Sequence, residues 1–145
     1  MEYRFYGWQT PDVKPIDPEW SKVKNQRHLY DLLLDCWTVE TCAPMFRPEW
    51  SEKNPTLGQC TITAFLVQDI FGGEVYGIPL PGGIVHCYNV VDGIIFDLTS
   101  EQFGRKVLEY ALENPQSREI KFARTMAKSR YELLKENLKK RLEME

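Results

Sequence analysis

Histidine and cysteine are both scarce in this sequence, which has two His and four Cys among 145 residues. The cysteines are not arranged in pairs two to four residues apart, the ligand spacing of most structural zinc sites. We therefore expect no metal and no cofactor. Internal repeats and low-complexity stretches are absent as well, so the chain is expected to form a single domain over residues 1–145.

No apolar run approaches the roughly 18 residues that a membrane helix needs, and no charged and then apolar leader opens the chain. These absences predict a cytoplasmic protein with free thiols and no membrane partner. No charge is in large excess, because 18 Lys and Arg stand against 21 Asp and Glu, a net charge of −3. Without a global basic field, nucleic acid is not an expected partner. The sequence does not indicate an oligomeric state.

Hydrophobic residues make up 43% of the chain, enough for a core, and their pattern predicts an α+β fold. The mostly apolar stretch 59–71 is typical of a buried helix that Gly72 and Gly73 end. The periodicity then changes from helical to alternating, and Asp92-Gly93 indicates a type I′ hairpin turn. We expect this central helix to pack on an antiparallel sheet with strands at 74–78, 84–91 and 94–99, and further helices near 18–36 and 125–142.

Cys60 is expected at the start of the central helix, directly after Gly58 and Gln59. Unpaired N–H groups and the helix dipole at this position stabilise a thiolate and lower the pKa of the thiol. The same N–H groups are suited to hold the oxyanion that forms when a thiolate attacks an acyl carbon. Cysteine is also among the most often buried residue types, so a structural role in the core is the alternative.

The hairpin that follows supplies a base for this thiolate. Its register, set by the two-residue turn, places His86, Tyr88 and Asp97 on one face of the sheet, with Asp97 within side-chain reach of the imidazole. Cys87 points to the other face and is expected to fill the core. We expect the helix over 59–71 to cover the face that carries His86.

A neutral histidine held by a carboxylate serves both as the base that forms a thiolate and as the acid that protonates a leaving group. The order Cys60, His86, Asp97 on a helix start, a strand and the next strand resembles the papain-like superfamily, in its transglutaminase-like and NlpC-like branches. The resemblance implies a nucleophile, a base and a residue that orients the base. The second histidine, His28, is expected on the surface or in helix packing.

Four more residues are candidates for binding the substrate or the oxyanion. Gln59 and Asn54 are alternatives for completing an oxyanion hole together with the Cys60 N–H. Tyr88 and Trp50 are candidates for lining the substrate cleft. Each has a structural alternative, since an Asn-Pro pair is typical of a turn and a tryptophan packs a long loop well.

Several segments resemble the YunG-like family of small bacterial proteins. The resemblance spans roughly residues 28–135, and its most specific element is Gly-Gln-Cys at the start of a helix, followed downstream by His-x-Tyr/Trp-Asn and Asp-Leu-Thr. At Cys87-Tyr88 this sequence departs from the aromatic pair expected in the family. The segments that carry the resemblance are 37–41, 50–60, 67–74, 86–89 and 97–103.

Two functions are compatible with these residues. The first is a thiol-dependent hydrolase or acyl transferase that acts on an amide, isopeptide or related acyl bond of a small molecule or peptide. The second is a module that binds a peptide or small molecule in the same cleft while Cys60 stays chemically idle. A redox or metal-sensing role for the cysteines has no support from their spacing. The loops 41–55 and 79–83, which would set specificity, carry no recognisable binding motif.

Overall fold

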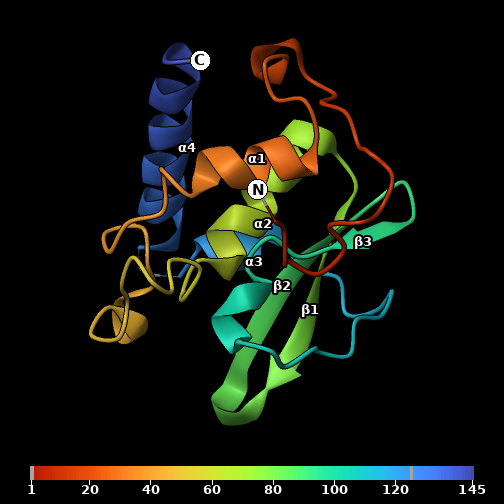
Figure 1. The fold of residues 1–145 in the computed structure, drawn as a ribbon. Helices are drawn as coiled ribbons and strands as arrows, with labels where there is room; N and C mark the ends of the chain where they lie inside the picture. Colours follow the sequence, from red (N-terminus) through yellow and green to blue (C-terminus); the bar gives the residue numbers. More distant parts are fainter. Residues whose placement is uncertain (1, 125) are drawn as a thin grey trace.

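The computed structural model describes residues 2–124 and 126–145, which form an α+β fold of four α-helices and a three-stranded antiparallel sheet (Figure 1). Helix α2 packs against β2 on one side and against α4 on the other. Long segments outside helices and strands precede α1, join α1 to α2 and join β3 to α3. In chain order the elements are α1 (Gln26–Leu33), α2 (Cys60–Phe71), β1 (Glu74–Leu80), β2 (Ile84–Val91), β3 (Ile94–Phe96), α3 (Arg118–Phe122) and α4 (Ala127–Glu143).

The hairpin between β2 and β3 has the predicted register. Its turn residues Asp92 and Gly93 both have positive φ, 51° and 77°, as a type I′ turn requires. The turn pairs Asn89 with Phe96, and β1 pairs with the other edge of β2, where Ile78 stands opposite His86. The sheet order is therefore β1-β2-β3, with β2 in the centre.

Strand β3 ends at Phe96, three residues before the predicted end. The backbone N–H of Asp97 donates to the Tyr6 carbonyl (2.9 Å), and the Asp97 carboxylate accepts from the Thr99 N–H (3.1 Å). An aspartate that binds the N–H two residues on turns the chain out of the strand. Because β3 pairs only with residues 89–91 of β2, His86 lies beyond the end of β3.

Helix α2 covers the sheet face opposite to the predicted one. The Thr61 hydroxyl lies 3.7 Å from Cys87 Sγ, and the Asn89 side chain donates to the Ala64 carbonyl (2.8 Å). The prediction that this helix covers the His86 face is therefore wrong. The face of Cys87 carries the fully buried apolar side chains of β3 and of the residues after it, so it offers α2 the larger apolar surface. Cys87 itself fills the core, as predicted.

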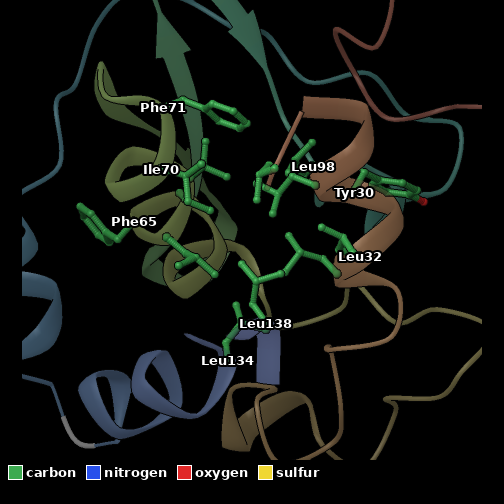
Figure 2. Close-up of a cluster of buried hydrophobic side chains, with 14 of the residues drawn as sticks. Tyr30, Leu32, Phe65, Ile70, Phe71, Leu98, Leu134 and Leu138 are labelled. Atoms are coloured by element: carbon green, nitrogen blue, oxygen red, sulfur yellow. The ribbon is translucent and has the colours of Figure 1, made fainter. Parts of the chain in front are cut away.

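The main hydrophobic core lies where α1, α2 and α4 meet the sheet (Figure 2). Leu32, Leu134 and Leu138 are at most 1% exposed and project from α1 and α4 toward α2. Fully burying one such leucine contributes roughly 2 kcal/mol to folding. The core holds α2 in place, and with it Cys60 at the helix start.

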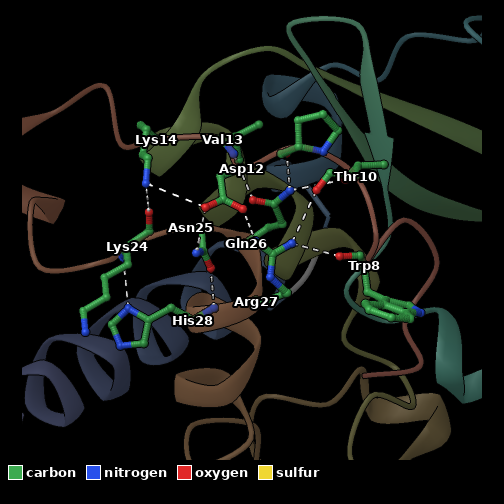
Figure 3. Close-up of polar contacts among 11 residues, drawn as sticks. Trp8, Thr10, Asp12, Val13, Lys14, Lys24, Asn25, Gln26, Arg27 and His28 are labelled. Carbon is green, nitrogen blue, oxygen red and sulfur yellow. Dashed lines mark hydrogen bonds and ion pairs between the residues drawn. The ribbon is translucent and has the colours of Figure 1, made fainter. Parts of the chain in front are cut away.

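The N-terminal segment is fixed to α1 by polar contacts (Figure 3). Gln26 is completely buried, accepts a hydrogen bond from the Val13 N–H (3.0 Å) and donates one to the Pro11 carbonyl (2.8 Å). In the same region the His28 ring accepts from the Lys24 N–H (2.9 Å) through Nδ1. His28 is thus a helix-packing residue, as predicted.

The one or two helices predicted near 18–36 correspond to a 3₁₀ turn, Pro18–Trp20, and to α1. The division follows from Asn25, whose side chain accepts from the His28 N–H (2.9 Å) and starts α1 as an N-cap. Residues 34–36 form turns rather than helix.

Two helices occupy the C-terminal part. The predicted tail helix, 125–142, corresponds to α4, while Thr125 lies outside the described residues. Helix α3, which was not predicted, is capped by Ser117, whose side chain accepts from the Ile120 N–H (3.3 Å). Across the described ranges, no helix has both the length and the apolar character to cross a membrane.

Candidate active site

Cys60 is the first residue of α2, as predicted, and is partly exposed. The chain reaches it through Gly58, whose φ is +72° and whose added Cβ would lie 2.6 Å from Cys42 Sγ. Both the backbone conformation and the space therefore require glycine. Because the first N–H groups of a helix have no intrahelical partner, Cys60 sits among donors that favour negative charge.

Arg130 on α4 fixes the loop that leads to Cys60. Its side chain is 8% exposed and donates from Nε to the Thr41 carbonyl (2.9 Å) and from Nη2 to the Gly58 carbonyl (3.1 Å). The guanidinium thus joins two points of the segment between α1 and α2. Burial lowers the pKa of Arg130, and the nearby Cys42 and Cys60 thiols oppose this effect.

His86 and Asp97 form a buried pair. His86 Nε2 donates to Asp97 Oδ2 (2.6 Å), and the side chains are 1% and 2% exposed. The same oxygen accepts from the Tyr110 hydroxyl (2.6 Å), while Oδ1 accepts from the Thr99 N–H (3.1 Å) and hydroxyl (3.2 Å). With four donors, the carboxylate is held in one orientation, and it fixes the imidazole in turn.

The other imidazole nitrogen, His86 Nδ1, is buried and has no hydrogen-bond partner among the described residues. The imidazole and the Phe103 ring pack in a T-shaped arrangement, at a centroid distance of 4.8 Å and an angle of 83°. His86 and Cys60 line the same cavity, which has a volume of about 840 Å³. Because Nε2 is bound to Asp97, Nδ1 is the nitrogen left to act on a group in this cavity.

The electrostatics of the site favour a thiolate on Cys60 and a proton on His86. The neighbouring Cys87 thiol, and after it His86, hold the pKa of Cys60 well below its usual value against the opposing effect of burial. Burial lowers the pKa of His86, but Asp97 and Cys60 outweigh it and raise the pKa to about 10. The pKa of Cys87 is raised well above the usual value, mainly by Cys60 and by burial. Of the two thiols, Cys60 is thus the one whose pKa favours the thiolate form.

Four predicted binding residues lie elsewhere, and within the described residues the cavity lining includes none of them. Gln59 is fully buried and donates to the Thr38 carbonyl (3.1 Å), because neighbouring positions at a helix start point about 100° apart. Asn54 lies in a turn in which its N–H donates to the Ser51 carbonyl (3.0 Å).

The remaining two, both aromatic, bind backbone carbonyls. Trp50 Nε1 donates to Pro55 (3.0 Å), and the Tyr88 hydroxyl donates to Ala111. Tyr88 stays on the His86 face, as predicted, but the segment around Ala111 covers it. Through its hydrogen bond to Pro55, Trp50 packs the long loop, which was the structural alternative to lining the cleft.

Sequence reasoning missed three residues at the site. Tyr110 holds Asp97, Phe103 packs on His86, and Lys121 of α3 lines the cavity. All three belong to the part of the chain after β3, where no regular pattern indicated a direction for the side chains. The described residues contain no group of three or more His, Cys, Asp or Glu suited to a metal ion.

Together, the fold and the site define an α+β protein whose central helix begins with a low-pKa cysteine beside a buried His–Asp pair. A family model described as "YunG protein" matches residues 25–143, and the chain therefore belongs to the YunG family. It is 35% identical over 98 residues to the "Uncharacterized protein YunG" of Bacillus subtilis (strain 168). That alignment covers 68% of this chain and 78% of the relative. No solved structure is significantly similar to the chain.

Proposed function

We propose that this protein is a thiol-dependent hydrolase or acyl transferase of papain-like type, with Cys60 as nucleophile, His86 as acid and base, and Asp97 as the residue that orients His86. One observation carries the proposal: His86 donates through Nε2 to Asp97, its Nδ1 is buried without a hydrogen-bond partner among the described residues, and His86 and Cys60 line the same cavity. A histidine kept only for packing would be expected to have both nitrogens bonded.

In the first half of the reaction, the Cys60 thiolate attacks the acyl carbon and the carbonyl electron pair moves to oxygen. When the tetrahedral intermediate collapses, the bond to the leaving nitrogen or oxygen breaks and protonated His86 donates the proton that the leaving group needs. The products of this half are a Cys60 thioester and the free amine or alcohol. His86 is left neutral and still bound to Asp97.

In the second half, water or an amine attacks the thioester, and neutral His86 accepts the proton of this nucleophile. Collapse of the second intermediate expels the Cys60 thiolate and regenerates the protonated imidazole. In both halves the oxyanion needs donors, for which the Cys60 N–H at the helix start is suited. The Gln102 side-chain amide, which lines the cavity and donates one N–H to the Thr99 carbonyl (3.0 Å), is the second donor we propose.

The cavity supports a substrate with an apolar part. Its walls come from residues 43–46, from the β1–β2 hairpin at 80–85, and from Phe103 and Leu108. A volume of about 840 Å³ is within the range of small-molecule sites. The acyl group or the leaving group is therefore expected to be a small molecule or a short peptide segment.

Incubation with p-nitrophenyl acetate tests the proposal. We expect one acetyl group on the peptide that contains Cys60, seen by mass spectrometry at short times. Cys60→Ser should abolish this acetylation and His86→Ala should slow it, while Cys42→Ala, which removes a buried thiol near the same loop, should not change it. Acetylation that is equal on all cysteines, or none at all, would overturn the enzyme and favour a binding module.

A further inference from the structure

The cavity at Cys60 has an unbalanced charge. Its described lining includes four cationic side chains and no Asp or Glu: Lys106, Lys121, Arg124 and Arg130. This excess is local, because the whole chain has a net charge of −3. A wall of one charge sign in a partly apolar pocket raises the local concentration of ligands of the opposite sign.

Lys121 is the cation of this cavity whose burial is least explained by contacts within the chain. It is 6% exposed, and its ammonium group forms no hydrogen bond or ion pair with the described residues. Because the side chain lines the cavity, its positive charge acts on groups bound there. Its charge reaches the reactive thiols, since it opposes the effects of Cys60 and of burial that raise the pKa of Cys87.

The position of Lys121 is fixed by its helix. Arg118, on the same short helix, forms an ion pair with Asp69 of α2 (2.7 Å) and donates to the Phe65 carbonyl (3.0 Å). Its guanidinium also lies 5.2 Å from the centroid of the Phe65 ring. Helix α3 is thereby attached to the helix that carries Cys60, and Lys121 is presented to the cavity.

We propose that Lys121 binds an anionic group of the acyl substrate, a carboxylate or a phosphate, with the exposed Arg124 and Lys106 assisting at the cavity mouth. The substrate class is then an acyl compound that has both an apolar part and a negative charge near the acyl carbon. This inference rests on the proposed function of Cys60. It adds a specificity-determining residue from a helix that does not belong to the Cys60–His86–Asp97 set.

Two alkylating reagents of similar size test this inference. Iodoacetate carries a carboxylate beside its reactive carbon, and iodoacetamide carries a neutral amide at the same place. The quantity to measure is the ratio of the Cys60 labelling rates with the two reagents, by mass spectrometry at constant pH and low salt. Because protonated His86 also attracts iodoacetate, the comparison between variants is decisive rather than the ratio in the native protein.

Lys121→Met should lower the iodoacetate to iodoacetamide ratio about fivefold, and Lys121→Arg should restore most of it. Lys128→Met removes one positive charge from α4 outside the cavity and should leave the ratio unchanged. Lys121→Met should not lower the Tm, because the native ammonium forms no hydrogen bond or ion pair with the described residues that the substitution would remove.

An unchanged ratio in Lys121→Met, with iodoacetamide still labelling Cys60 preferentially, would overturn the anion site and leave the proposed reaction in place. An equal fall in Lys128→Met would overturn it as well, since the effect would then be one of net charge. If iodoacetamide showed no preference for Cys60, the proposed function and this inference would fail together.

Discussion

The two histidines occupy contrasting regions. The first is the α1 region, which is α1 together with the N-terminal segment that contacts it. Here His28 Nδ1 accepts from the Lys24 N–H and Nε2 lies 2.9 Å from a Glu145 carboxylate oxygen, so both ring nitrogens have partners within the chain. At the cavity, His86 is bonded through Nε2 to Asp97, while Nδ1 has no hydrogen-bond partner in the part of the chain that the structure describes. The same side chain thus completes local structure in one region and keeps a buried nitrogen unbonded in the other.

The two regions also differ in the contacts of other buried polar side chains, although Asp31 Oδ1 on α1 is buried without a hydrogen-bond partner among the described residues. Gln26 in the α1 region is fully buried and its contacts join α1 to the N-terminal segment. Lys121 at the cavity is nearly as buried and has no partner among the described residues. An unmet buried polar group costs roughly 1–3 kcal/mol, so the buried His86 Nδ1 beside this cavity points to a function that needs it there.

The largest expected effect concerns stability in the α1 region. Gln26→Ala leaves the Val13 N–H and the Pro11 carbonyl without partners and should lower the free energy of unfolding by about 3 kcal/mol. Urea unfolding measures this loss. A loss below about 1 kcal/mol would mean that this network is not what holds the N-terminal segment.

A smaller effect is expected on the pH dependence of the free energy of unfolding, to which His86 and Cys60 contribute in opposite directions. The pKa of His86 is raised from 6.5 to about 10, so its contribution to stability is complete below pH 6.5 and is lost as the pH rises through about 10. The pKa of Cys60 is lowered, so its contribution is complete above its usual value of 9.0 and is lost as the pH falls through the lowered pKa. Between pH 6.5 and 9, the contribution of His86 to the free energy of unfolding falls with rising pH, and the contribution of Cys60 rises.

Cys60→Ala removes the contribution of Cys60 to this pH dependence and leaves that of His86. Its free energy of unfolding, relative to that of the native protein, should therefore fall by about 1 kcal/mol per pH unit between pH 6.5 and 9. Urea unfolding at several pH values gives this difference and cancels the groups that both proteins share. A difference that does not change with pH would exclude a thiolate–imidazolium pair.

The smallest expected effect compares two cysteines at neutral pH. Cys87 is 1% exposed in the core, and Cys87→Ala should lower the free energy of unfolding by roughly 1 kcal/mol, which is a Tm decrease of a few degrees. Cys60→Ala should change the Tm less, because Cys60 is partly exposed at the cavity. Thermal melts that show the reverse order would exchange the structural and reactive roles of the two cysteines.

The parts of the fold that depend on local signals could be predicted from the sequence. The Asp92-Gly93 turn fixes the β2–β3 register by itself, and Gly72 ends α2 as a residue that adopts positive φ. The sequence order of Cys60, His86 and Asp97 was also informative, because the first stands at a helix start and the other two on a hairpin of known register.

The parts that depend on long-range contacts could not be predicted. Alternation shows that His86 and Cys87 face opposite ways, but not which face receives α2, since this depends on the apolar area that each face offers. Tyr110 lies in the irregular segment after β3, and Lys121 lies on the short helix that follows it, so no periodicity indicates where either side chain runs. Gln59 was misassigned because its distance from Cys60 in the sequence says nothing about the direction of its side chain.

The most direct test of the account is the pH dependence of Cys60 alkylation by iodoacetamide in the native protein, His86→Ala and His28→Ala. We predict that the native rate reaches its plateau well below pH 9 and that His28→Ala leaves the profile unchanged. His86→Ala should slow labelling at pH 6 by about tenfold or more, the effect of one pKa unit. A native profile with its midpoint near 9, unaffected by His86→Ala, would contradict the central claim that His86 activates Cys60.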